Sequence, residues 1–163
     1  MNTFLKLAAG RGLSPLLSLL LVAPPATAAQ PASLVLSNAW VRALPPGQPN
    51  TAAYLTVANT GAEQATIVGA SAAIADAAQI HTTREVDGYQ RMEQLTRLPV
   101  APGQSLEFAP GGTHIMLLGL ARMPAVGDEV RLCLQVAGGG EVCTVAEVRK
   151  GTGGEQSHEH HQH

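Results

Sequence analysis

The segment Val130-Arg-Leu-Cys-Leu-Gln-Val136 alternates between two kinds of side chain. Its even-numbered residues are all apolar and share one face of an extended strand, which points inward. Three glycines, Gly138-Gly139-Gly140, then turn the chain, and residues 142–148 return. A turn centred on Gly138 pairs residue 133 with residue 143 and residue 131 with residue 145. The segment therefore predicts an antiparallel hairpin with an inward apolar face.

Short strands and Gly/Pro turns recur upstream of this hairpin. Thr51 to Asn59 alternates and ends in a turn at Asn59-Thr60-Gly61, Asn38 to Leu44 is extended and ends at Pro45-Pro46-Gly47, and Gln64 to Ala70 is a short apolar run. Such spacing indicates an all-β fold, an antiparallel sandwich or barrel. The best helical candidate is the short Ala-rich segment Ser71–Ala78.

The first 28 residues have the features of an export signal. Lys6 and Arg11 precede an apolar run, Leu13 to Ala23, and small residues around Ala28 form a cleavage site. The run is shorter than the about 20 residues that span a bilayer. We expect cleavage after Ala28 and a periplasmic mature protein with no membrane span. An uncleaved membrane anchor is the alternative.

Cleavage would leave one domain over residues 29–150 and a flexible tail over residues 151–163. The leader holds two of the ten basic residues and none of the twelve acidic ones, so the mature chain carries a formal charge of −4. An acidic chain with few aromatic residues lacks the electrostatic footprint of a nucleic-acid-binding protein. We expect a monomer with no nucleic-acid partner.

Two histidines and two methionines are placed to form a metal site. The strand His114-Ile-Met116 puts His114 and Met116 on one face. The dipeptide Asp87-Gly88 predicts a two-residue hairpin turn, from which Thr83 pairs with Met92 and His81 with Gln94. Met92 is then the diagonal neighbour of His81, about 7–8 Å away at Cα and within reach of a long side chain.

Two imidazoles and two thioethers are a ligand set that selects Cu(I). Zn(II) prefers imidazole, thiolate and carboxylate ligands. A blue-copper electron-transfer site needs a cysteine ligand, and neither cysteine lies near either histidine in sequence. The alternative for each of the four residues is an ordinary structural role in a strand. Their joint placement on matching faces favours a copper site.

These residues resemble the motif of the periplasmic copper chaperone family called PCu(A)C. The family spaces His, Met, His and Met by ten, twenty-one and one residues, as do His81, Met92, His114 and Met116. Flanking segments are also similar, and the resemblance covers about residues 36–149: Ala39-Trp40-Val41-Arg42, Pro45-Pro46-Gly47, Ala53-Tyr54, Asn59-Thr60-Gly61, Pro110 to Leu117 and Gly127-Asp128. Many members have Met directly after the first His, where this chain has Thr82. The difference removes a spare ligand and leaves the set of four intact.

The resemblance implies a cupredoxin-like, Greek-key β-sandwich or barrel that holds Cu(I) near its surface. It also implies a non-enzymatic copper chaperone that supplies copper for respiratory cytochrome oxidase assembly. The acceptor would be an oxidase subunit or a Sco-type copper protein. Two alternatives stay open, a periplasmic copper buffer for metal resistance and a copper-reducing redox protein.

The chain ends in a histidine-rich tail. His158, His160, His161 and His163 follow the polar linker that starts at Gly151. Neutral imidazoles on such a tail suit Cu(II), and similar extensions in the family resemble a second copper site. An artificial purification tag is the alternative, against which the interspersed Glu159 and Gln162 argue.

The two cysteines fall opposite each other in the hairpin predicted over residues 130–148. The register pairs Cys133 with Cys143, and both are expected to point away from Leu132 and Leu134 toward the outer face. Export to an oxidising compartment favours a cross-strand disulfide. A dithiol that reduces Cu(II) and a third metal site are the alternatives.

Overall fold

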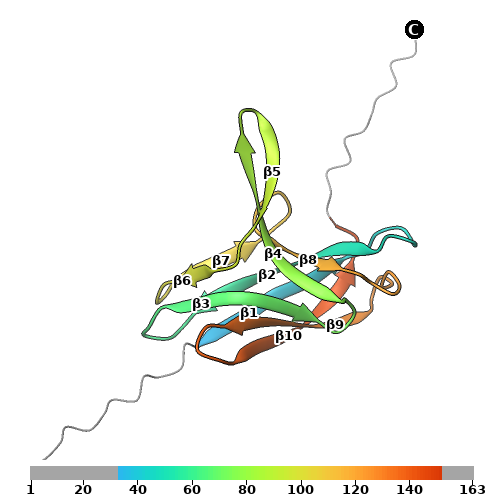
Figure 1. The fold of residues 1–163 in the computed structure, drawn as a ribbon. Helices are drawn as coiled ribbons and strands as arrows, with labels where there is room; N and C mark the ends of the chain where they lie inside the picture. The colour runs from blue at the N-terminus through green and yellow to red at the C-terminus, as the bar shows by residue number, and fades with distance from the viewer. Residues whose placement is uncertain (1–32, 152–163) are drawn as a thin grey trace, which may run out of the picture.

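The computed structural model describes residues 33–151 and contains ten strands and no helix within that range (Figure 1). The strands are β1 (Leu34–Arg42), β2 (Asn50–Asn59), β3 (Ala65–Ala72), β4 (Ala77–Val86), β5 (Tyr89–Gln94), β6 (Leu98–Val100), β7 (Ser105–Phe108), β8 (His114–Leu118), β9 (Glu129–Val136) and β10 (Glu141–Arg149). The all-β prediction is confirmed.

The helix expected at Ser71–Ala78 is wrong. Strand β3 continues to Ala72, a turn follows, and β4 begins at Ala77. Ala70 pairs with Ala78 across this turn. Alanine favours a helix, but a segment this short gains little from helix propensity alone, so pairing with neighbouring strands decides its conformation.

The strands form one sheet that curls back on itself. Their order is β5-β4-β8-β2-β1-β10-β9-β3-β6, and an additional pairing of β4 with β3 brings the two ends of the path together. Most pairs are antiparallel as predicted, but β1 and β10 run parallel, with Val41 opposite Val148. The fully antiparallel expectation is therefore wrong for this pair. Local turns specify only the pairing of the strands that they connect, and β1 and β10 are the first and last strands in the sequence of the domain.

Apolar side chains from all around the sheet fill its interior. The predicted β9–β10 hairpin is present in the expected register, and Leu132 and Leu134 are fully buried. Leu55, Ile67, Ile115 and Leu117 are likewise fully buried. Burying each such side chain contributes about 1.5–3 kcal/mol, so the interior holds the strands in place.

Cys133 and Cys143 form the predicted disulfide, with an S–S distance of 2.09 Å. Their expected outward position is only partly correct. Cys143 is half-buried and Cys133 is only 5% exposed. The reason is that β3 packs along β9 and places Ser71 beside Cys133.

One hairpin extends beyond the body of the fold. Residues 77–81 of β4 pair with β8, and residues 81–86 of β4 pair with β5. Asp87 and Gly88 at the turn both have positive φ, as a two-residue turn with this sequence requires. Figure 1 shows this hairpin rising from the barrel, and every residue of β5 is exposed.

Candidate metal centre

Strand β8 supplies the buried half of the predicted site. His114 is 5% exposed and Met116 is half-buried, and both lie on the face of β8 opposite the core residue Ile115. The Nδ1–H of His114 donates to the carbonyl oxygen of Gly112 at 2.9 Å. A carbonyl only accepts, so this contact places the proton on Nδ1 and leaves the Nε2 lone pair of the neutral ring free for a metal.

The β4–β5 hairpin supplies the exposed half. The register predicted from the Asp87-Gly88 turn is observed, with His81 opposite Gln94 and Thr83 opposite Met92. Met92 is therefore the diagonal neighbour of His81 on the same face. Its side chain is 55% exposed, the largest exposure among the four predicted ligands that are described.

The pairing of β4 with β8 brings the two halves together. His81 lies directly opposite His114, and Gln79, two residues earlier on β4, lies opposite Met116. The four predicted ligands thus share one face of three adjacent strands. The ring centres of His81 and His114 are 6.0 Å apart. Two imidazoles bound to one ion through metal–nitrogen bonds of about 2 Å have their ring centres about 5 Å apart at a tetrahedral angle and about 6 Å apart at a wider angle, so the observed spacing is close to that of a shared ion.

His81 is held as a neutral ring with an unused polar atom. Its Nε2 lies 3.0 Å from the side-chain oxygen of Gln79, and its Nδ1 is buried without a hydrogen-bond partner. Burial lowers the pKa of His81, and the nearby His114 lowers it further. A neutral ring with an unpaired buried nitrogen is suited to coordinate a metal.

The surrounding donors limit the class of metal. Among residues 33–151, only Cys133, Glu141 and Cys143 form a group of three His, Cys, Asp or Glu ligands. The two sulfurs of that group are joined in the disulfide and offer no thiolate. Within the described chain, His81 and His114 consequently have no third ligand of these types close enough to share an ion. Met92 and Met116 are the sulfur donors on their face, beside the amide side chains of Gln79 and Gln94. Thioethers favour Cu(I).

The position of Thr82 corrects its interpretation as the site of a missing spare ligand. Thr82 lies opposite Glu93 on the other face of the hairpin from His81, and its hydroxyl is 3.4 Å from that of Thr113. A side chain at this position leads away from the four ligands.

Two supporting residues were not identified from the sequence. Gln79 contacts His81, and the carbonyl of Gly112 orients His114. Strand alternation places Gln79 on the same face as His81, two residues later, so the sequence could have revealed the contact between them. A backbone carbonyl gives no sequence signal, so the second could not have been found.

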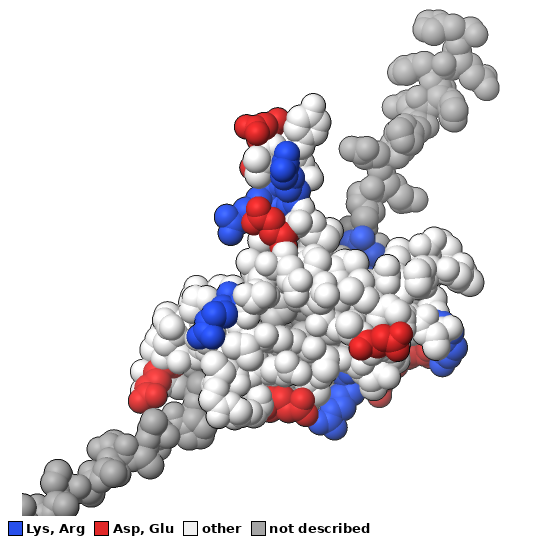
Figure 2. Space-filling model, viewed as in Figure 1, with Lys and Arg blue, Asp and Glu red and all other residues white. Residues whose placement is uncertain are grey.

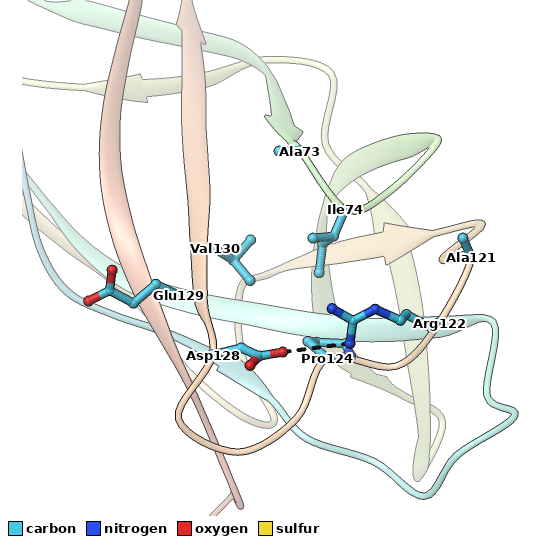
Figure 3. A pocket seen from close by; sticks show the side chains of 8 residues that line it. All are labelled: Ala73, Ile74, Ala121, Arg122, Pro124, Asp128, Glu129 and Val130. Carbon is cyan, nitrogen blue, oxygen red and sulfur yellow. Dashed lines mark ion pairs between the residues drawn. The ribbon is translucent and has the colours of Figure 1, made fainter.

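A cavity of about 390 Å³ lies beyond the other end of the β4–β8 pair. Figure 3 shows the carboxylate of Asp128 pointing toward Arg122 in this cavity, at 3.8 Å. The same carboxylate accepts a hydrogen bond from the backbone of Ala125 at 2.9 Å. These polar groups are used within their own loop, and none of the predicted ligands lines the cavity.

Two features predicted from the sequence lie outside the described residues. They are the leader over residues 1–28 and the tail ligands His158, His160, His161 and His163. Within residues 33–151, no helix has the length and apolar character needed to cross a membrane.

Comparison with known sequences identifies a family for nearly all of the described domain. Residues 34–148 match the family described as "LpqE-like: Putative lipoprotein LpqE-like". The putative lipoprotein Lxx21020 of Leifsonia xyli subsp. xyli (strain CTCB07) is 33% identical over 126 residues, which cover 76% of this chain and 74% of that protein.

Comparison with solved structures identifies the same fold in copper-related domains. The solution structure of CuI-DR1885 from Deinococcus radiodurans is 31% identical, covers 78% of this chain and 85% of that chain, and has a TM-score of 0.60. The copper-bound PCuAC domain from PmoF2, at 22% identity and a TM-score of 0.59, covers 72% of this chain and 93% of that chain and shares the fold. The cupredoxin-like fold and the PCu(A)C resemblance expected from the sequence are confirmed.

Proposed function

Because this chain belongs to the LpqE-like family and has the fold of a PCuAC domain, we propose that it is a non-enzymatic copper chaperone of the cell envelope. It holds one Cu(I) ion between His81, Met92, His114 and Met116. It then passes the ion to another protein.

The observation that carries this proposal is the pairing of His81 with His114. That pairing puts the ring centres of the two imidazoles 6.0 Å apart. Met92 is the diagonal neighbour of His81, and Met116 follows His114 on the same face of β8. A 31% identical relative with the same fold is described in its Cu(I) form, which supports the same cargo here.

The uneven exposure of the ligands supports delivery rather than permanent storage. Transfer by ligand exchange needs at least one ligand that an acceptor can replace while the others hold the ion. Met92 is exposed on the hairpin, whereas His114 is buried in the barrel wall. We expect the acceptor to displace Met92 first and His114 last.

The proposed destination of the copper has two parts, the compartment and the acceptor protein. The leader-like residues 1–28 and the lipoprotein descriptions of the family and the Leifsonia relative support export to the cell envelope, with the periplasm as the proposed compartment. Delivery for respiratory cytochrome oxidase assembly, to an oxidase subunit or a Sco-type protein, follows from the PCu(A)C resemblance.

A transfer experiment tests both the site and the function. Cu(I)-loaded protein is mixed with an apo Sco-type protein or an apo oxidase copper domain, and copper in each is measured after separation. We expect transfer from the natural protein and loss of loading in His114→Ala. Loading and transfer that survive this change would contradict the site. Tight loading without transfer to any oxidase component would identify a copper buffer instead.

The histidine-rich tail is proposed as a separate Cu(II) site. Deletion of residues 156–163 should remove Cu(II) binding and leave Cu(I) binding unchanged, as measured by titration with each ion. Unchanged Cu(II) binding in the truncated protein would contradict this assignment. A copper-reducing role finds less support, because Cys133 and Cys143 are joined in a disulfide and in that form carry no thiol electrons to donate.

A further inference from the structure

Strand β5 has one edge that no other strand within residues 33–151 covers. It pairs with β4 and stands at the end of the strand order, and its six residues are all exposed. An open edge is a template for pairing with another strand. This edge also carries Met92, so whatever pairs with it comes next to the proposed copper ligand.

One backbone hydrogen bond shows which residues of β5 direct their backbone groups to this edge. Leu95 donates its N–H to the carbonyl of Ile80 on β4 at 2.8 Å, so the odd-numbered residues of β5 direct their backbone groups toward β4. The backbone N–H and C=O groups of Gln90, Met92 and Gln94 consequently point to the free edge. A second strand must match these three positions.

A second copy of β5 matches them, and charge selects its register. Two antiparallel registers satisfy the backbone pattern and overlap nearly the whole strand. One is centred on Arg91 and places the two copies of Arg91 opposite each other, which is unfavourable. The other is centred on Met92 and places Arg91 of each copy opposite Glu93 of its partner.

The charges on the hairpin favour the second register further. Within one copy, Arg91 faces Arg84 across the hairpin, and Glu93 pairs with Arg84 at 3.5 Å. Arg91 makes no ion pair among residues 33–151. Figure 2 shows charged side chains of both signs gathered on the hairpin above a mostly uncharged face of the barrel. Glu93 of the partner copy would give Arg91 the acidic partner that residues 33–151 of its own chain do not provide.

We propose that a second copy of this chain docks along the free edge of β5 in the register that places Met92 opposite Met92 of the partner copy. The Cα atoms of such a pair lie about 5.5 Å apart with both side chains on the ligand face. Each copy then offers a thioether to the metal site of the other. This last point rests on the proposed function, whereas the docking itself does not.

One short strand per copy buries much less than the about 1,200 Å² typical of stable complexes. The pairing is therefore transient, and the chain is monomeric when dilute. A transient encounter with adjacent Met92 side chains suits the exchange of copper between copies.

Charge reversal tests the register. Self-association of the metal-free mature chain is measured by sedimentation equilibrium with a chelator present, so that the tail cannot bridge copies through a metal. Arg91→Glu and Glu93→Arg should each weaken self-association about tenfold, because each turns two attractive pairs into repulsive ones. An equal mixture of the two variants, or the double variant, should regain the natural level. Equal association of all samples would overturn the proposal.

Cross-linking tests the same register independently. Met92→Cys, oxidised without metal, should give a disulfide-linked dimer, whereas Gln90→Cys should not, because residue 90 lies opposite residue 94 of the partner. Cross-linking of both variants to the same extent, or of neither, would overturn the proposal. Because both experiments are metal-free, their failure leaves the copper site standing. Loss of the copper site would appear instead as a failure of Cu(I) binding with docking intact.

Discussion

Strand β8 and the β4–β5 hairpin each contribute one histidine and one methionine, yet they differ in almost every physical respect. Strand β8 lies within the barrel, between β4 and β2, and its Ile115 and Leu117 are fully buried. The hairpin rises from the barrel, and its β5 strand is entirely exposed (Figure 1). For the proposed copper site, we infer from this difference a division of labour in which β8 would retain the ion and the hairpin would release it.

The largest expected effect comes from the β8 half. His114→Ala removes a buried ligand and leaves the Gly112 carbonyl without its donor. Since removing a residue that only supports a metal ligand costs about 10–100-fold in affinity, loss of the ligand itself should cost more than about hundredfold. Competition with a Cu(I) chelator measures this. An affinity within tenfold of the natural protein would show that β8 does not retain the ion.

A smaller effect is expected from the hairpin half. Met92→Ala should weaken Cu(I) binding about tenfold, or about 1.4 kcal/mol. It should also change the free energy of unfolding by less than about 0.5 kcal/mol, because the side chain is largely exposed. The two quantities are read from chelator competition and urea unfolding. Gln94→Ala, on the same strand and face, is the matched control and should leave both unchanged.

The pH response should separate the domain from the tail. Burial lowers the pKa of His81, so its ring stays neutral below the usual value of about 6.5. Cu(II) binding by the tail should therefore weaken at a higher pH than the His81 contribution to Cu(I) binding. Titrations of the truncated and full-length chains at several pH values check the order. Simultaneous loss of both would contradict it.

The same lowered pKa predicts how the metal-free fold responds to acid. Below pH about 6.5 the unfolded chain binds a proton at His81 before the folded chain does. Acidification through this window should thus reduce the free energy of unfolding. His81→Gln removes the group and should flatten that part of the stability profile, as measured by denaturant unfolding.

The smallest effect is expected at Thr82, which faces away from the ligands. Thr82→Met should change Cu(I) affinity less than about twofold, an energy within the ordinary range of surface substitutions. A much tighter site in this variant would show that the hairpin can rotate its other face toward the ion. Both faces of the exposed hairpin, and not only the face that carries Met92, would then be able to contribute a ligand.

Sequence reasoning predicted how the residues of each half of the proposed site are arranged, and missed what surrounds them. The Asp87-Gly88 turn gave the register of Met92 against Thr83, and alternation placed His114 with Met116, as observed. The helix expected at Ser71–Ala78 was wrong because the composition of a short Ala-rich segment does not report the strands beside it. The carbonyl of Gly112 had no sequence signal at all.

The sequence by itself determined the features that depend on neighbours along the chain. These are the β9–β10 register with its disulfide, the β4–β5 register, and the spacing of the four proposed ligands. Turn type and side-chain alternation act over a few residues, so they can be read without knowing the fold.

Only the tertiary structure decided that β4 lies beside β8, with His81 opposite His114, and that β1 runs parallel to β10. It also decided that Met92 is exposed while His114 is buried. These pairings join strands distant in sequence, and they form because the apolar faces of all the strands must close around one interior.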